Sequence, residues 1–144
     1  AHKLERALQM GAELGIHTPH DDVVKSVMAF TNKRGVDVVI ENVGEAVWGD
    51  AMKSLVRGGK LVTCGATSGD QPPADLRRIF IRQLQIIGST LGNLQEFKDL
   101  LAFCDQHKIR PVIDRTFTMN QVHDALDVMS RAEQFGKLAL DLTH

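Results

Sequence analysis

Apolar and polar positions follow two different periods along this chain, and both are clearest in its middle third. Residues 36–40 form a nearly continuous apolar run, which is typical of a strand buried on both faces of a parallel sheet. After a polar turn, residues 45–56 carry apolar side chains at helical spacing, and residues 60–64 form a second β-rich run. The pattern predicts a strand–helix–strand unit whose strand ends, near Asn42 and Gly65, meet at one edge of the sheet. Open α/β sheets bind ligands at that edge.

The same two periods continue on both sides of this unit. Helical spacing favours helices over residues 2–10, 21–30, 74–82, 94–107 and 119–131. β-rich runs favour strands over residues 13–17, 84–91, 111–117 and 137–142. The alternation of strands and helices predicts an α/β fold with a parallel sheet and flanking helices. A change of composition near Gly92 predicts a boundary between residues 1–91 and residues 92–144.

Composition and charge narrow the classes of partner. The chain has 144 residues, of which 43% are hydrophobic, and a formal net charge of -1, as in an ordinary globular protein with a core. No basic stripe runs along the sequence and aromatic residues make up 5% of it, so we expect no nucleic-acid partner. No apolar run approaches the roughly 20 residues of a membrane span, and the N-terminus lacks a signal-like segment. We therefore expect no membrane partner and a cytoplasmic location.

Metal ligands and nucleophiles are scattered along the chain. Two cysteines, Cys64 and Cys104, are too few for a disulfide framework or a cysteine-based zinc site. The six histidines show no metal-binding spacing, and the sequence contains no Gly-x-Ser-x-Gly motif. We therefore expect neither a metal site nor a catalytic residue here. Cys64 is expected to be a small buried side chain rather than a nucleophile, because no histidine is placed near it by sequence.

Six short strings, taken in order, resemble one known family. They are KLERALQMGAE, RGVDVVIENVG, LVRGGKLVTCGATSG, LQIIGSTLG, KIRPVIDRTF and FGKLAL. In this order and spacing they resemble the C-terminal portion of medium-chain dehydrogenase/reductases, in the zinc-type alcohol dehydrogenase and quinone reductase branch. The resemblance implies a partial Rossmann-type dinucleotide-binding domain over residues 1–91. It also implies that residues 92–144 are the segment that, in this family, returns to the catalytic domain.

The resemblance further implies parts of the family that would precede Ala1. These are the first two strands of the cofactor domain, with a Gly-rich fingerprint and a ribose-binding acidic residue, and a catalytic domain with zinc ligands. Since the sequence also begins with Ala rather than Met, we expect a piece of a longer protein that is inactive alone. In the strand order 3-2-1-4-5-6, the strand expected at residues 13–17 would be separated from the next strand of the chain by two absent strands. The parent's cofactor would be NADP or NAD, and zinc is possible in the parent but finds no ligands in this chain.

The strand ends of the middle unit carry the first group of candidate cofactor residues. By resemblance, Asn42 and Val43 match residues that lie against the adenosine part of the cofactor. The alternative is a plain turn with a capping asparagine. By the same resemblance, Cys64, Gly65 and Ala66 match a segment whose backbone meets the nicotinamide, where a bulky side chain would occupy the place of the ring. The alternative is an ordinary Gly-rich turn.

A second group of candidates lies outside this unit. Ser89, Thr90 and Leu91 match a strand end that binds the nicotinamide carboxamide through backbone groups in the family, although a strand end without a binding role fits the sequence nearly as well. Lys3 matches a lysine that reaches the adenosine ribose, or the 2′-phosphate of NADP. The alternative is a solvated lysine at the start of a helix.

These candidates leave three hypotheses for function. The first is a fragment of an NAD(P)-dependent oxidoreductase that contributes the nicotinamide and adenosine walls of the cofactor site. The second is a noncatalytic nucleotide-binding or interaction module on the same scaffold, and the third is a methyltransferase, which the absence of a Gly-rich loop disfavours. We also expect a homodimer through the strand at residues 84–91, because this strand pairs across a twofold axis in the family and an open apolar edge would otherwise invite aggregation.

Overall fold

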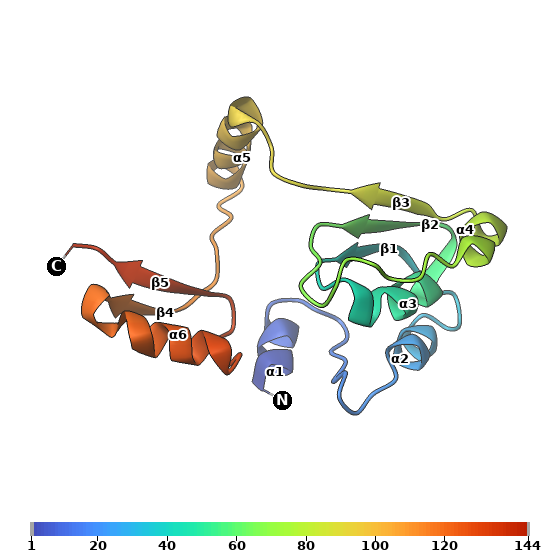
Figure 1. The fold of residues 1–144 in the computed structure, drawn as a ribbon, viewed down its shortest axis with the longest axis horizontal. Helices are drawn as coiled ribbons and strands as arrows, with labels where there is room; N and C mark the ends of the chain where they lie inside the picture. Colours follow the sequence, from blue (N-terminus) through green and yellow to red (C-terminus); the bar gives the residue numbers. More distant parts are fainter. Residues whose placement is uncertain (1, 144) are drawn as a thin grey trace. The chain divides into compact units, whose positions relative to one another are not determined.

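The computed structural model describes residues 2–143 and has two compact units, residues 1–91 and residues 92–144 (Figure 1). Each unit contains its own parallel sheet, with three strands in the first and two in the second. The α/β class and the parallel pairing predicted from the sequence are therefore confirmed. No helix among the described residues is long and apolar enough to cross a membrane.

The sheet of the first unit contains strands β1 (Val36–Glu41), β2 (Leu55–Thr63) and β3 (Gln85–Gly88), in that spatial order. All three run parallel. The order of the strands along the chain is thus their order in the sheet, and all three carboxyl ends lie at one edge. This is the arrangement predicted for the last three strands of a Rossmann-type sheet.

Three helices flank this sheet: α2 (Val23–Phe30), α3 (Glu45–Ser54) and α4 (Leu76–Arg82). α3 packs against β1, β2 and α2, whereas α4 packs against β2. α2 and α4 begin where aspartates cap them, because the Asp22 side chain accepts a hydrogen bond from Lys25 N, and Asp75 accepts one from Arg78 N.

The core of the first unit lies between α3 and β2. Its buried members are Met52, Leu55, Leu61 and Leu84. Leu55 and Leu61 are completely buried, and each contributes about 1.5–3 kcal/mol by burial. Trp48 packs against this cluster, as expected for a core tryptophan.

β1 departs from the prediction of a strand buried on both faces. Val38 is 49% exposed and Ile40 is 68% exposed, whereas Val39 is half-buried and Glu41 is buried. From residue 38 onward the strand therefore alternates, with one covered and one open face. The physical reason is that the helices packing on β1 cover the side of Val39, and the described residues supply no layer over Val38 and Ile40.

The short strand predicted at residues 13–17 is not formed, and that prediction was wrong. This segment is irregular and follows helix α1 (His2–Gln9). A strand requires a neighbour that accepts its backbone hydrogen bonds, and among the described residues β1 pairs with β2 alone. The segment at residues 13–17 therefore has no strand among the described residues to pair with.

β2 begins at Leu55, earlier than the residues 60–64 expected. Val36 pairs with Leu55 and Val38 pairs with Lys60, so residues 56–59 bulge out opposite a single residue of β1. Gly58 has a φ of +75° within this bulge, a conformation that favours glycine. Gly58 and Gly59, which follow the helical spacing of residues 45–56, thus belong to β2.

The second unit repeats the strand–helix–strand pattern. Its elements are α5 (Leu94–Gln106), β4 (Ile113–Thr118), the 3-10 helix η1 (Met119–Gln121), α6 (Val122–Ser130) and β5 (Lys137–Asp141). β4 and β5 are parallel, and α6 contacts both. Ala125 and Val128 are the buried hydrophobic residues of α6.

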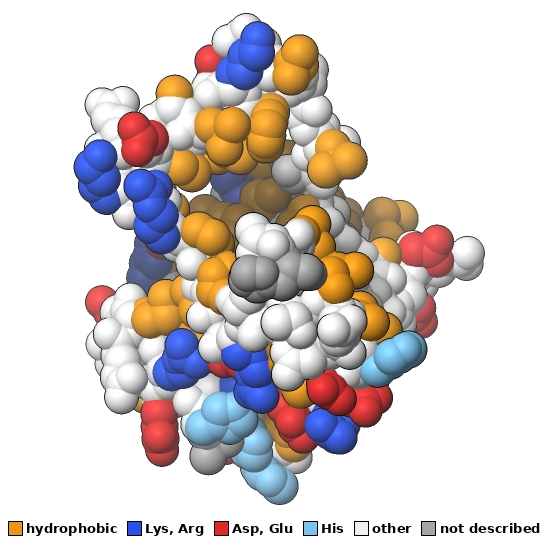
Figure 2. Space-filling model, turned by 90° about the vertical axis from the view of Figure 1, so that its left-hand side faces the viewer, with side chains coloured by type: hydrophobic (Ala, Val, Ile, Leu, Met, Phe, Trp, Pro, Cys, Tyr) orange, Lys and Arg blue, Asp and Glu red, His pale blue; other side chains and the backbone are white. Residues whose placement is uncertain are grey.

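α5 exposes a large part of its hydrophobic surface. Phe97 and Leu100 are each 55% exposed, and Leu94 is 70% exposed. Figure 2 shows hydrophobic side chains beside charged ones on this helix, at the top of the view. Asn93 and Glu96 form a capping box at its start, so local hydrogen bonds stabilise this helix end.

Candidate functional site

The carboxyl ends of β2 and β3 border a shallow, open cavity of about 460 Å³. Its lining consists of Thr63, Cys64, Gly65, Ala66, Gly88, Ser89 and Thr90. A smaller cavity of about 310 Å³ is lined by Cys64, Ser89, Thr90 and Leu91. Six residues predicted from two distant stretches of sequence, residues 64–66 and 89–91, therefore lie together at this edge.

Backbone hydrogen bonds fix the two walls of this cavity. Cys64 N donates to Glu41 O at 2.9 Å, and Ser89 N donates to Thr63 O at 2.9 Å. These bonds extend the parallel pairing by one residue beyond the ends of β2 and β3. The backbone that leaves each strand is therefore held in place by its neighbour rather than by its own side chains.

Glu41 organises the turn that leaves β1. Its side chain is buried, and its Oε1 accepts hydrogen bonds from Val43 N at 2.5 Å and Gly44 N at 2.6 Å. Hydrogen bonds to a charged acceptor are among the strongest in proteins. Glu41 therefore positions Asn42 and Val43, two of the predicted cofactor residues. Sequence reasoning missed this role, although an acidic residue at the end of an apolar run was a visible signal.

Two glycines allow the loops after β1 and β2 to touch. A Cβ atom on Gly65 would lie 2.6 Å from Asn42 O, which is backbone and cannot move aside. Gly44 has a φ of +99°, and a Cβ there would meet Gly69 O. Side chains at either position would push the two strand ends apart.

Ser68 joins the same two loops and was also missed by sequence reasoning. Its backbone N donates to Val43 O at 2.7 Å, and its Oγ donates to the same oxygen at 2.8 Å. The Ser68 Oγ in turn accepts from Ala46 N at 3.0 Å, at the start of α3. The loop after β2 is thereby fixed against both the end of β1 and the first turn of α3.

Cys64 is exposed, which corrects the expectation of a buried side chain. The reason is that β2 ends at Thr63, so Cys64 stands just beyond the last residue of the strand, on the cavity wall. Its Sγ lies 3.7 Å from Glu41 O, a long contact to a neutral acceptor.

Lys3 lies on α1 and is half-buried. It is absent from the lining of both cavities at the ends of β2 and β3. The structure therefore does not bring Lys3 together with the other predicted residues at those cavities.

The chemistry offered by this edge is that of a binding surface. The larger cavity is lined by small, uncharged side chains and by backbone of the two strand ends, and a Cβ on Gly88 would meet nothing within 4 Å. Such a surface can hold a flat ring and hydrogen-bond an amide through backbone groups. No group of three or more His, Cys, Asp or Glu side chains among residues 2–143 is placed to hold a metal ion.

Comparison with known families agrees with this geometry. The model of the zinc-binding dehydrogenase family matches residues 1–106. The chain belongs to the zinc-binding dehydrogenase family. The resemblance stated from the sequence strings is thus confirmed, and the methyltransferase hypothesis is set aside.

Individual relatives in this family are distant and considerably longer. The chain is 27% identical over 139 residues to an NAD-dependent alcohol dehydrogenase of Saccharolobus solfataricus, covering 95% of this chain and 40% of the relative. It is 24% identical over 149 residues to the quinone oxidoreductase-like protein 2 of Bos taurus, covering 97% of this chain and 43% of that protein. The chain thus spans about two fifths of the relatives it matches.

Solved structures give the same result. The alcohol dehydrogenase of the archaeon Aeropyrum pernix superposes with a TM-score of 0.84 at 28% identity, over 98% of this chain and 40% of that chain. A crystal structure of an NAD-dependent alcohol dehydrogenase gives the same TM-score, 0.84, at 28% identity, over 98% of this chain and 41% of that one. The fold described above is therefore the fold of part of an alcohol dehydrogenase.

Proposed function

We propose that this zinc-binding dehydrogenase chain supplies the nicotinamide and adenosine walls of the cofactor site of an NAD(P)-dependent oxidoreductase. The observation that carries the proposal is the cavity of small residues at the ends of β2 and β3. It lies at the edge of a parallel sheet where α/β folds bind nucleotides. Membership in the family supports a nicotinamide dinucleotide as the ligand.

Each predicted residue has a distinct task in this proposal. The backbone of residues 89–91 hydrogen-bonds the nicotinamide carboxamide, and residues 64–66 lie against the ring. Asn42 and Val43, held by Glu41, form the wall for the adenosine part. Lys3 contacts the adenosine ribose or its phosphate, as the family resemblance implies. When bound, the cofactor supplies hydride transfer, while these residues bind and orient it.

The family implies two bound groups, a nicotinamide cofactor and a zinc ion, and only the first fits the residues of this chain. The nicotinamide fits, because the cavity walls are backbone and small side chains that leave room for a ring. Zinc does not fit, because the described residues place no set of three ligands together. Any zinc of the complete protein would depend on residues outside those described here.

The isolated chain is expected to be inactive. Its candidate site contains no side chain placed to move a proton, since the Glu41 carboxylate is buried and bonded to backbone N–H groups. Purified chain mixed with NADPH or NADH and a carbonyl, quinone or enone substrate should show no oxidation of the cofactor at 340 nm above the rate without protein. Turnover that scales with protein concentration would contradict this part of the proposal.

A noncatalytic nucleotide-binding module is the second candidate, and the absence of a proton-moving group favours it equally. The two candidates differ in expected affinity, because the given sequence contains no G-x-G-x-x-G turn, which binds the pyrophosphate at a helix start in Rossmann domains. The oxidoreductase fragment should bind NADPH weakly. Tight binding of NADPH without turnover, measured by NADPH fluorescence, would favour the module.

A homodimer through β3 completes the proposal. Ile86 and Ile87 are each 41% exposed, and β3 pairs with β2 alone among the described strands. Pairing with a second copy would satisfy its free edge. Light scattering should give twice the monomer mass at micromolar concentration, and a monomer mass would contradict the dimer.

From the sequence, we also propose a cytoplasmic location.

A further inference from the structure

A further cavity, of about 530 Å³, lies at the amino ends of the first unit's three strands. Its lining residues come just before each strand, with Arg34 two residues before β1, Lys53 two residues before β2, and Arg82 three residues before β3. All the predicted cofactor residues except Lys3 follow the carboxyl ends of these strands. This cavity and the one at the ends of β2 and β3 therefore lie at opposite edges of one sheet.

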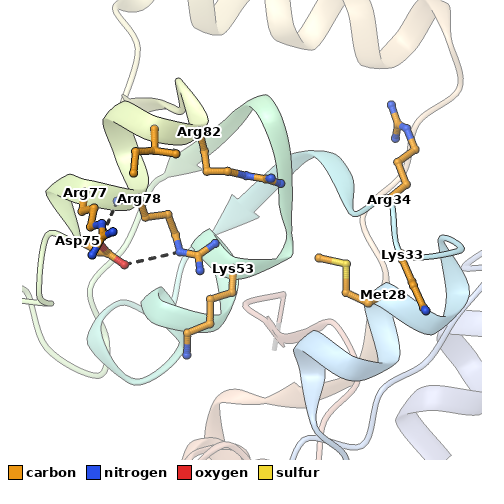
Figure 3. Close-up of a pocket in the computed structure, with 9 residues that line it drawn as sticks. Met28, Lys33, Arg34, Lys53, Asp75, Arg77, Arg78 and Arg82 are labelled. Atoms are coloured by element: carbon orange, nitrogen blue, oxygen red, sulfur yellow. Dashed lines mark hydrogen bonds and ion pairs between the residues drawn. The ribbon is translucent and has the colours of Figure 1, made fainter.

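The lining of this cavity at the amino ends of the strands is strongly basic. It contains six cationic side chains and one carboxylate, that of Asp75; the cations are Lys33, Arg34, Lys53, Arg77, Arg78 and Arg82. Figure 3 shows Arg78, Lys53 and Arg82 close together on one side, with Met28, Lys33 and Arg34 on the other. We call this the basic cavity.

Acidic side chains neutralise the basic cavity in part. Arg34 is bound by Asp37 at 2.7 Å, and the hydrogen bond to Asp37 raises the pKa of the Arg34 guanidinium. Lys53 lies 3.4 Å from Asp50. The remaining excess of positive charge is concentrated on α4 and points to an anionic ligand.

Two arginines of the basic cavity have buried donors without an acceptor. The Nε atoms of Arg78 and Arg82 are shielded from solvent and make no hydrogen bond. Arg78 Nε forms an ion pair with Asp75 Oδ2 at 3.6 Å, which is longer than a hydrogen bond, and Arg82 uses its Nη2 to bond Leu55 O at 3.1 Å. A buried N–H without a hydrogen-bond partner is unfavourable, so an acceptor that reaches these donors would bind favourably.

We propose that the basic cavity binds a small anion that carries two or more phosphate groups, such as a nucleoside di- or triphosphate or inorganic triphosphate. Arginine binds phosphate oxygens through two parallel N–H donors of its planar guanidinium, and lysine binds them through the compact charge of its ammonium group. Because the basic cavity holds several cations, a ligand with several phosphate groups matches its charge better than a single phosphate does. This site is separate from the proposed cofactor site and does not depend on it.

The size of the basic cavity favours a small ligand over a nucleic acid. Its volume of about 530 Å³ lies within the roughly 300–1,000 Å³ range of small-molecule sites. Nucleic acids instead bind along an extended basic groove with aromatic side chains for stacking, and no aromatic residue lines this cavity.

Calorimetric titration of the complete 144-residue chain with inorganic triphosphate, at low salt, tests the proposal. One triphosphate should bind per chain, and Arg78→Gln should weaken binding by about tenfold or more. Arg78→Lys keeps the charge but loses the Nε donor, so it should fall between Arg78→Gln and wild type. Arg131→Gln, which removes an exposed arginine of the second unit, should leave the affinity unchanged, as should Thr90→Ala at the cofactor edge.

Three results would overturn the proposal. They are no binding of triphosphate, an equal loss in Arg131→Gln and Arg78→Gln, or a single-stranded oligonucleotide that binds more tightly than triphosphate and depends on Arg78. If the circular dichroism spectrum shows that Arg78→Gln does not fold normally, an NMR titration of the wild-type chain replaces the comparison of variants. The ¹⁵N–¹H signals of the Arg78 and Arg82 Nε atoms should then shift on adding triphosphate, and their failure to shift would also overturn the proposal.

Discussion

The two edges of the three-stranded sheet differ in almost every physical property. At the carboxyl edge, small side chains and backbone line the cavity, and the loops after β1 and β2 are held at hydrogen-bond distance by Glu41 and Ser68. At the amino edge, long cationic side chains line the cavity, and two of their donors have no acceptor. One edge presents backbone and small uncharged side chains, whereas the other presents long cationic side chains.

This difference shows how one sheet can offer two kinds of recognition. A flat, uncharged ring requires close approach to backbone, which glycine and short side chains permit. A phosphate group requires charge and several N–H donors, which can come from flexible side chains on separate elements. Both edges rest on the same core between α3 and β2, so the two sites can be perturbed separately or together.

The largest effect should come from removing the core that both edges share. Leu55 is completely buried at the start of β2, and Leu55→Ala should lower the free energy of unfolding of the first unit by about 2–5 kcal/mol because it leaves a cavity. Trp48 is the one tryptophan of the sequence and belongs to this unit, so its fluorescence during urea unfolding reports on that unit. Ile40→Ala, at a residue 68% exposed, is the matched control and should change stability little. Equal losses in both variants would contradict the described core.

A smaller effect should distinguish two glycines of the carboxyl edge. Gly65→Ala places a Cβ 2.6 Å from Asn42 O and should destabilise the first unit by about 1–3 kcal/mol through overpacking. Gly88→Ala meets nothing within 4 Å and should be neutral or stabilising by up to about 1 kcal/mol. The Trp48 unfolding transition measures both variants. If Gly65→Ala is as stable as Gly88→Ala, the close approach of the two strand ends is wrong.

The smallest effect concerns pH at the amino edge. The Arg34 guanidinium hydrogen-bonds Asp37 and holds the pKa of that carboxyl below its ordinary value of 3.8. Since the folded pKa is the lower one, the stabilisation by Asp37 is present above pH 3.8 and is lost as the pH falls through the folded value. Wild type should therefore be slightly more stable than Asp37→Asn at pH 7, and the two should converge in acid. A difference that is unchanged between pH 7 and pH 2.5 would contradict this ion pair, and Asp70→Asn, at another exposed aspartate of the unit, is the control.

The sequence predicted the carboxyl edge well because its information is local. Residues 64–66 and 89–91 each follow a strand directly, and parallel strands bring their ends to one edge. The resemblance of the family strings is the basis for the proposal of a nicotinamide dinucleotide at this edge. The sequence could not show that Cys64 is exposed or that Glu41 is buried, because burial at a strand end depends on where the strand stops and on which loop packs over it.

The amino edge was not predicted, and the reason is also physical. Its cations are spread over residues 33–82 and lie on α4, at the end of α3 and in the turn that precedes β1. No stretch of the sequence is basic enough to show as a stripe, although RRIFIR on α4 carries three arginines at helical spacing. The prediction of a strand at residues 13–17 was wrong for a different reason. A strand forms by pairing with another strand, and the described residues supply no partner for this segment.

The most direct test of the central claim, that the carboxyl edge holds nicotinamide, is an ¹H–¹⁵N NMR titration of the chain with nicotinamide riboside. This ligand carries the ring but no phosphate, so it separates the two edges. The backbone amides of residues 64–66 and 89–91 should shift, while those of Lys53, Arg78 and Arg82 should not. Absence of shifts at residues 64–66 and 89–91, with shifts elsewhere or none at all, would contradict the claim.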